Sequence, residues 1–169
     1  MEYLTVPLNS SHKRKDFKCG KGLLDNYLHY QAKQDLKRRL SACFIYPDEE
    51  NNIRGYYTLS NAGIHREILP EDIKKILPKS YNSLPATLSG RLAVDKTFAG
   101  KGIGELLMMD ALKRSFYTSV QSIASMAVIV DPIDQEAIRF YRKYGFILLP
   151  DSGKMFLLMI TISELFIQK

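Results

Sequence analysis

The sequence has few of the residues that build cross-linked or metal-linked scaffolds. Its two cysteines, Cys19 and Cys43, form no C-x-x-C pair, and its three histidines are scattered. This argues against a disulfide framework and against a zinc site. The longest apolar run, Met155–Ile160, is far shorter than the about 20 residues that cross a bilayer, and no signal-peptide core follows the N-terminus. We therefore expect a soluble, cytoplasmic protein with no metal and no membrane partner.

The chain also lacks repeats, low-complexity tracts and any linker long enough to divide it. Its 169 residues fit one domain, so we expect a single domain over residues 1–169. Apolar residues make up 46% and charged residues 25%, which excludes a disordered, collagen-like or coiled-coil chain. The net charge of +6 suits a phosphate-bearing partner, although it suits simple solubility equally well.

Hydrophobic periodicity predicts strands and helices in mixed order. The predicted strands are residues 2–8, 42–46, 53–64, 86–95, 122–130, 146–149 and 155–162, and the predicted helices are 22–39, 70–77, 103–116 and 134–144. Tight turns join some neighbouring strands and helical crossovers join others. The pattern therefore predicts an α/β fold with a central mixed β-sheet flanked by helices.

A glycine-rich turn separates the predicted strand 86–95 from the predicted helix 103–116. Its residues are Ala99, Gly100, Lys101, Gly102, Ile103 and Gly104. Glycines leave backbone N–H groups uncovered, and a helix N-terminus adds unpaired donors and a positive end, which together suit a phosphate. Neither the P-loop nor the G-x-G-x-x-G spacing is present. From spacing alone, an ordinary flexible turn is an equal alternative.

This turn resembles the Q/R-x-x-G-x-G/A signature of the GNAT acetyltransferases, whose loop holds the pyrophosphate of acetyl-coenzyme A. Ala99 stands where that signature has Gln or Arg. Residues 137–146, AIRFYRKYGF, resemble the family's A-x-x-F-Y-x-x-x-G-F segment, and Asp134 replaces an Asn that often precedes it. The resemblance implies a GNAT acyl-CoA N-acyltransferase fold and acetyl-CoA as cofactor.

The resemblance also implies residue roles. Backbone N–H groups of 92–94 would polarise the thioester carbonyl, and Tyr141 would protonate the leaving thiolate. Tyr144 is assigned to packing. The implied cofactor-binding residues are Leu92, Ala93, Val94, Ala99, Gly100, Lys101, Gly102, Ile103, Gly104, Asp134, Ala137 and Phe140.

Residues 17–20, 24–28, 55–60 and 84–95 resemble a narrower branch, the GNAT toxins of type II toxin–antitoxin systems. That branch acetylates the α-amine of an amino acid esterified to tRNA, which implies aminoacyl-tRNA and a small DNA-binding antitoxin as partners. Homodimers are frequent in the family. An α-amine, with a pKa of about 8, is partly neutral at neutral pH, whereas a lysine at about 10.4 is not. The general-base candidates, by residue type only, are Asp95, Glu105, Asp110 and His65.

Basic residues could follow an RNA backbone. One group of basic residues, before the first predicted helix, consists of Lys13, Arg14, Lys15, Lys18 and Lys21. The candidate substrate-binding residues are Lys33, Lys37, Arg38, Arg39 and Arg91. Solvated charges are the alternative. The other acceptors considered are a small amine, a peptide N-terminus and a ribosomal protein. A non-catalytic acyl-CoA-binding module and a nucleic-acid binder without catalysis remain as alternatives. The last would need aromatic platforms, but helical spacing predicts that Tyr27 and Tyr30 pack in the core.

Overall fold

The computed structural model describes residues 2–167. The chain forms two compact units. The first comprises Met1–Ser60 and Ser89–Arg114, and the second comprises Asn61–Leu88 and Ser115–Lys169. One long strand, β3 (Ile53–His65), and one long helix, α4 (Ile103–Gln121), contribute residues to both units.

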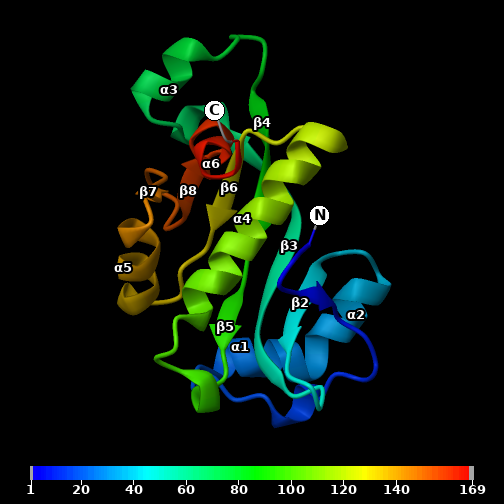
Figure 1. Cartoon of the computed structure of the whole chain (residues 1–169). Coiled ribbons are helices and arrows are strands. Elements are labelled where there is room, and N and C mark those ends of the chain that lie inside the picture. The colour runs from blue at the N-terminus through cyan, green and yellow to red at the C-terminus, as the bar shows by residue number, and fades with distance from the viewer. Residues whose placement is uncertain (1, 168–169) are drawn as a thin grey trace. The chain divides into compact units, whose positions relative to one another are not determined.

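Eight strands form a sheet in the order β1-β2-β3-β4-β6-β8-β7, with β5 paired to β3 (Figure 1). The other strands are β1 (Val6–Pro7), β2 (Ala42–Pro47), β4 (Ser83–Ser89), β5 (Leu92–Val94), β6 (Ala127–Val130), β7 (Ile147–Leu148) and β8 (Met155–Leu158). The β1/β2, β2/β3, β3/β5, β6/β8 and β7/β8 pairs are antiparallel. The neighbours β4 and β6 are joined by a long connection that contains β5 and α4, which is the kind of connection that parallel neighbours need. The predicted α/β fold with a mixed sheet is confirmed.

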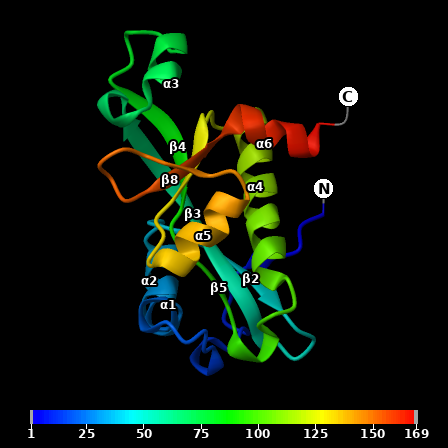
Figure 2. The same cartoon turned by 90° about the vertical axis from the view of Figure 1, so that its left-hand side faces the viewer.

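The helices agree with the sequence pattern at most of their ends. They are α1 (Gly22–Asn26), α2 (Ala32–Lys37), α3 (Glu71–Ile76), α4, α5 (Gln135–Lys143) and α6 (Met159–Phe166). A π-helical turn, Tyr27–Gln31, joins α1 to α2, so the predicted helix 22–39 is one helical segment with a wider turn inside it. Figure 2 shows α6 following β8 in the second unit.

Two predicted strands had wrong boundaries. Residues 86–95 are not one strand, because the pairing is interrupted at Gly90 and Arg91 between β4 and β5. Residues 122–126 are not strand either, because α4 runs to Gln121 and β6 begins only at Ala127.

The two ends of the chain were also predicted incorrectly. Within residues 2–8, only Val6 and Pro7 pair as a strand, and the amide of Leu4 instead donates to Asp110 Oδ1 over 2.7 Å. The predicted strand 155–162 becomes helix α6 at Met159. An apolar run of this length fits a buried strand or a buried helix, and periodicity alone does not separate the two.

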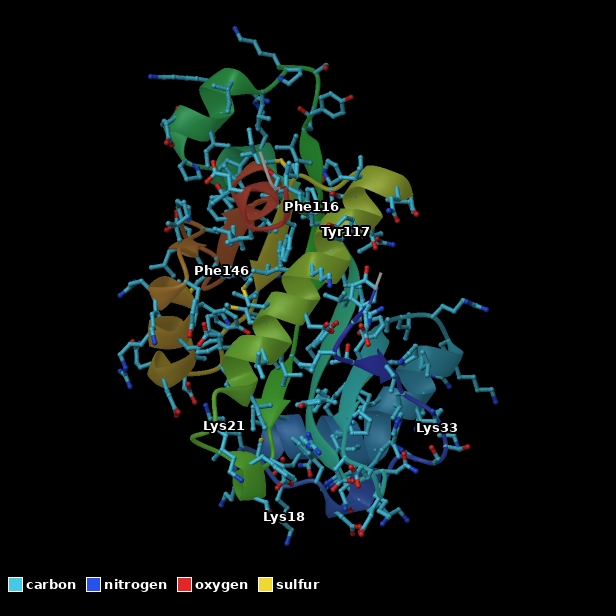
Figure 3. The ribbon with its side chains drawn as sticks, in the orientation of Figure 1. Lys18, Lys21, Lys33, Phe116, Tyr117 and Phe146 are labelled. Carbon is cyan, nitrogen blue, oxygen red and sulfur yellow. The ribbon has the colours of Figure 1, made fainter. Side chains whose placement is uncertain are left out.

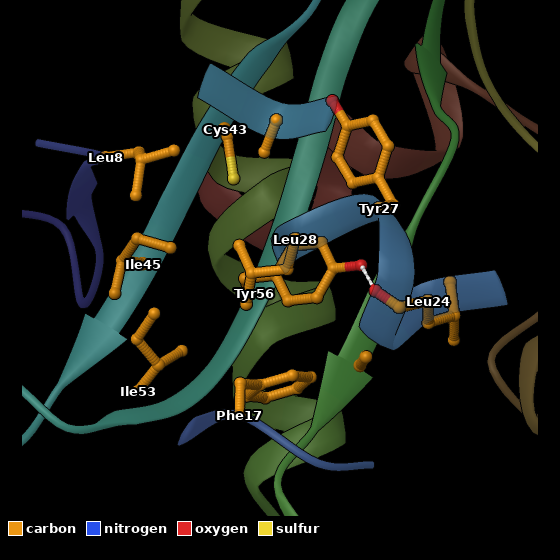
Figure 4. Close-up of a cluster of buried hydrophobic side chains, with 11 residues drawn as sticks. Leu8, Phe17, Leu24, Tyr27, Leu28, Cys43, Ile45, Ile53 and Tyr56 are labelled. Atoms are coloured by element: carbon orange, nitrogen blue, oxygen red, sulfur yellow. Dashed lines mark hydrogen bonds between the residues drawn. The ribbon is translucent and has the colours of Figure 1, made fainter. Parts of the chain in front are cut away.

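A buried hydrophobic core holds the helical segment 22–37 against β2 and β3 in the first unit (Figure 4). Phe17, Leu28, Ile45 and Tyr56 are each at most 1% exposed. The Tyr56 hydroxyl donates to the carbonyl of Leu24 over 2.7 Å. Because β5 pairs with β3 beside this core, the core fixes the position of β5 in its unit.

The second unit has a separate aliphatic core. Its buried members are Ile64, Leu69, Ile73, Leu84, Ala86, Ala127, Ile129, Leu149 and Phe156. These side chains come from β3, β4, β6 and β8, from α3 and from the loop segments next to them. The core therefore packs the strands of this unit together with α3.

Candidate functional site

Strand β5 presents two backbone amides at an edge that is not covered by another strand. The amide of Thr58 donates to the carbonyl of Arg91 over 3.0 Å, and the amide of Asp95 donates to the carbonyl of Arg54 over 2.9 Å. Since residues alternate in direction along an antiparallel strand, Ala93 also faces β3 while the N–H groups of Leu92 and Val94 point away from it. No second strand pairs with β5 among residues 2–167. Two of the three predicted oxyanion donors thus lie at this open edge, and Ala93 does not.

Residues 17–19, which we call the strap, close one end of the edge. The amide of Lys96 donates to the carbonyl of Lys18 over 2.8 Å, and the amide of Lys18 donates to Asp95 Oδ2 over 2.9 Å. The strap is anchored by the buried side chain of Phe17. The open edge therefore ends before Lys96.

The glycine-rich loop starts from a capped turn. Asp95 Oδ1 accepts the amide of Thr97 over 2.9 Å at the start of a short 3-10 helix, Lys96–Phe98. Gly100 and Gly102 have φ angles of +75° and +74°, and a Cβ on either would meet no atom within 4 Å. These positions need glycine for the backbone angle rather than for space.

The surroundings of this loop fit an anionic group. Ala99, Gly100, Lys101 and Gly102 are exposed, and α4 begins directly after them at the buried Ile103. The Lys101 ammonium and the Arg54 guanidinium each lie 5.7 Å from the centre of the Phe98 ring. Uncovered amides at the N-terminus of a 19-residue helix, with two cations nearby, suit phosphate groups such as those of coenzyme A.

Tyr141 lies on α5 in the second unit. It is 7% exposed and packs edge-on against Phe140 and Phe146, with ring centres 5.2 Å apart in both cases. Within the described chain, its hydroxyl makes no hydrogen bond. Burial raises the pKa of Tyr141. The hydroxyl therefore stays protonated over the whole physiological pH range, as a proton donor must.

The other cofactor-binding residues predicted in this region, Asp134, Ala137 and Phe140, cap or pack helix α5. Asp134 is the N-cap of α5, and its Oδ1 accepts the amide of Ala137 over 2.9 Å. Ala137 and Phe140 are half-buried along the helix. Tyr144 is also half-buried, with its ring 5.2 Å from that of Phe140, which agrees with the packing role predicted for it.

The structure separates the four general-base candidates. The Asp95 carboxylate accepts hydrogen bonds from the backbone amides of Lys18 and Thr97. Asp110 is buried and accepts hydrogen bonds from the Leu4 amide, the Thr5 hydroxyl and the Tyr57 hydroxyl. Both carboxylates therefore hold the fold together. Glu105 and His65 are exposed, the first in the first turn of α4 and the second at the end of β3.

The predicted substrate-binding cations fall into two kinds. Lys33, Lys37, Arg38 and Arg39 are exposed on α2 and the turn after it. Arg91 differs, because it is half-buried with its guanidinium 3.5 Å above the Tyr27 ring. In the view of Figure 3, Lys33 lies on the opposite side from Lys21, with Lys18 below them.

One aromatic side chain lies in a different environment from the one predicted. Tyr27 is in the core, as predicted, at 4% exposed, but Tyr30 is 70% exposed. The reason is the π-helical turn Tyr27–Gln31, whose extra residue per turn changes the direction of the side chains. Apolar spacing gives no signal for such a turn.

The two cysteine thiols are not in a setting that would make them nucleophiles. Burial raises the pKa of the Cys19 thiol to about 11 and that of the Cys43 thiol to about 12, so neither forms a thiolate at neutral pH. Across residues 2–167, no three His, Cys, Asp or Glu side chains are grouped as metal ligands. No helix in the described part of the chain has both the length and the hydrophobicity that a bilayer crossing needs.

Comparison with known proteins agrees with these features. The model of the acetyltransferase (GNAT) domain family matches residues 39–148. A tRNA-acetylating toxin of Mycobacterium tuberculosis is 30% identical over 144 residues, which cover 85% of this chain and 84% of the toxin. A tyrosine-to-phenylalanine mutant of KacT is 28% identical, with a TM-score of 0.84 over 92% of this chain and 93% of KacT. A chain of the KacTA–DNA complex is 25% identical, with a TM-score of 0.77 over 98% and 97%. The chain therefore belongs to the GNAT family of acetyltransferases.

Proposed function

We propose that this enzyme transfers the acetyl group of acetyl-CoA to the α-amine of an amino acid carried by tRNA, and that it blocks translation as a toxin. The observation that carries the proposal is the 30% identity, over most of both chains, to a tRNA-acetylating toxin. Arg91 and the exposed cations of α2 are the groups we propose for RNA binding. We further propose that residues 1–169 act as one catalytic domain.

Acetyl-CoA supplies a thioester whose acetyl group can be passed to an amine. The residues of the loop, Ala99–Gly104, would hold its phosphates through backbone amides and the N-terminus of α4. At the open edge of β5, the N–H groups of Leu92 and Val94 are fixed donors for pantetheine or for an oxyanion. Asp134, Ala137 and Phe140 complete the set that we propose for cofactor binding.

We propose Tyr141 as the general acid. Its side chain is 7% exposed, and its hydroxyl makes no hydrogen bond to another described residue. Burial raises its pKa, so the hydroxyl carries its proton at neutral pH and can pass it to a departing thiolate. No side chain is assigned as a strong general base. An α-amine needs little help, because at neutral pH a sizeable fraction of it is already unprotonated.

The proposed activity has consequences for partners and location. Charged tRNA is found in the cytoplasm, so we propose that the enzyme acts there. A KacTA–DNA complex contains a chain that is 25% identical to this one, which supports a small DNA-binding antitoxin as partner of this chain. We also propose that the chain forms a homodimer, by analogy with other members of the family.

The test is transfer of labelled acetyl from acetyl-CoA into charged tRNA, with uncharged tRNA and free amino acids in parallel. We expect label only on charged tRNA, in a form that is released when the aminoacyl ester is hydrolysed. Label on small amines or on protein N-termini, with none on tRNA, would overturn the proposed acceptor. Binding of acetyl-CoA without transfer to any of these would instead indicate a non-catalytic module.

A further inference from the structure

The π-helical turn between α1 and α2 is held by specific contacts. Its wider spacing frees carbonyl groups, and the Arg14 guanidinium donates to the carbonyl of His29 over 3.2 Å and to that of Leu28 over 3.5 Å. The His29 ring is in turn bound through Nε2 to the carbonyl of Phe17 over 2.7 Å. Turns of this kind are frequent at functional positions. The turn is therefore a fixed element of this structure.

This turn places Tyr27 and Tyr30 in opposite environments. Tyr27 is buried beneath the Arg91 guanidinium, whereas Tyr30 is 70% exposed. In the described chain, the Tyr30 ring has one aromatic neighbour, the His29 ring, whose centre is 5.7 Å away at an interplanar angle of 90°. A large aromatic ring is thus presented to solvent by a turn whose carbonyl groups are bound by Arg14.

The side chains one helical turn away from Tyr30 are polar or positively charged. The residues one helical turn away, Asn26, Lys33 and Gln34, are all exposed. On α2 the exposed ionised side chains are Lys33 and Lys37, because Asp35 is buried (Figure 3 labels Lys33). Protein interfaces that bury an aromatic anchor are depleted in lysine, whereas surfaces that bind single-stranded nucleic acid combine aromatic rings with cations.

We propose that Tyr30 is a stacking platform for an unpaired nucleobase of the RNA acceptor, with Lys33 and Lys37 contacting the adjoining phosphates. This inference rests on the proposed function, since it names how the acceptor's nucleotides are recognised. Stacking accepts any base, because every base has a flat face. Tyr30 thereby increases the affinity for RNA without selecting its sequence.

The experiment compares two acceptors of the same amino acid: the charged tRNA, and its methyl ester, which has no nucleotide. We expect Tyr30→Ala to lower kcat/KM for charged tRNA about tenfold, the usual scale for one stacked base. We expect no change with the methyl ester. Tyr30→Trp should retain activity on tRNA, because it preserves a stacking surface.

Tyr81→Ala is the matched control, since Tyr81 is also an exposed tyrosine, at 52%, but lies on a loop of the second unit. We expect it to act on both substrates as the wild type does. An unchanged kcat/KM of Tyr30→Ala on tRNA, or an equal loss on tRNA and ester, would overturn the stacking role while leaving the proposed function intact. A wild-type enzyme without activity on charged tRNA would overturn both.

Discussion

At the residue scale, the side chain proposed as general acid, Tyr141, has a ring that is packed and a hydroxyl that is unbonded. Its ring is enclosed by Phe140 and Phe146, while its hydroxyl has no hydrogen-bond partner in the described structure. The buried hydroxyls of Tyr56 and Tyr57 differ, because they donate to the Leu24 carbonyl and to Asp110, whereas the buried Tyr27 hydroxyl also has no hydrogen-bond partner in the described structure.

Removing the Tyr141 hydroxyl should separate activity from stability. We expect Tyr141→Phe to lower kcat about a hundredfold or more, as loss of a general acid does. The melting temperature should stay the same or rise, because no hydrogen bond of the folded chain is lost. Enzyme assays with thermal unfolding check both. Tyr56→Phe is the control, and it should lower stability because it leaves the Leu24 carbonyl without this donor.

Asp110 should show the reverse behaviour. Its carboxylate is buried and accepts three hydrogen bonds, with Arg114 4.0 Å away. Asp110→Asn replaces one carboxylate oxygen by an NH2 group, which would face the N–H and O–H donors that the oxygen now accepts from. We therefore expect a loss of about 2–4 kcal/mol in the free energy of unfolding. Activity of the folded fraction should change little. A stable variant that has lost catalysis would mean that Asp110 is a general base after all.

At the scale of elements, the glycine-rich loop can be tested against an equivalent turn elsewhere. Gly100→Ala forces an L-residue to a φ of +75°, which costs about 1–2 kcal/mol. We expect this variant to raise KM for acetyl-CoA, because the loop will relax away from its amide-presenting shape. Gly153→Ala is the matched control, since Gly153 has a φ of +69° and equally open surroundings in the β7–β8 turn.

The two variants should lose similar stability by urea unfolding. Only Gly100→Ala should weaken acetyl-CoA binding by calorimetry. Equal binding by both variants would remove the loop from the cofactor site and return it to the status of an ordinary turn.

Elements with strong local signals were predicted well from the sequence. Helix α5 has an Asp cap at its start and Gly145, with a φ of +91°, after its end, and its limits were found almost to the residue. The start of α4 at Ile103 was likewise predicted from the glycines before it. The glycine-rich loop and Tyr141 could therefore be located from the sequence, because the loop leads into α4 and Tyr141 lies on α5.

Features that depend on tertiary contacts were missed. The interruption at Gly90 and Arg91 has no signal in an apolar pattern that continues on both sides. The π-helical turn depends on Arg14, which lies more than ten residues away in the sequence. The direction of each amide of β5 also required the register with β3. These are the details that decide which backbone groups and rings are available to a ligand.

At the scale of the whole molecule, the ten tyrosines make stability sensitive to alkali. Burial raises the pKa of Tyr27 to about 12 and raises those of Tyr56, Tyr57 and Tyr141 as well. In the unfolded chain these groups ionise near pH 10, whereas the folded chain keeps their protons. Above about pH 10 the unfolded state therefore binds fewer protons, and stability falls as the pH rises.

We expect the free energy of unfolding, measured in urea, to show no loss from these groups between pH 8 and pH 9.5 and to decline above about pH 10. Tyrosinate absorbance should show one fraction of tyrosines that ionises early and another that ionises only with unfolding. Ionisation of all ten in a single early step, with the fold intact, would contradict the burial described above.

An exposed strand edge normally invites another chain to pair with it, and this protein limits that hazard at β5 by length. Only the amides of Leu92 and Val94 are presented, because the amide of Lys96 is already bound to Lys18. The three residues of β5 span about 10 Å, whereas a typical strand of five or six residues spans about 17–20 Å. The edge is long enough for a small ligand that needs one or two donors, and too short to recruit a strand. The same strap that borders the site thus protects the chain from aggregating through it.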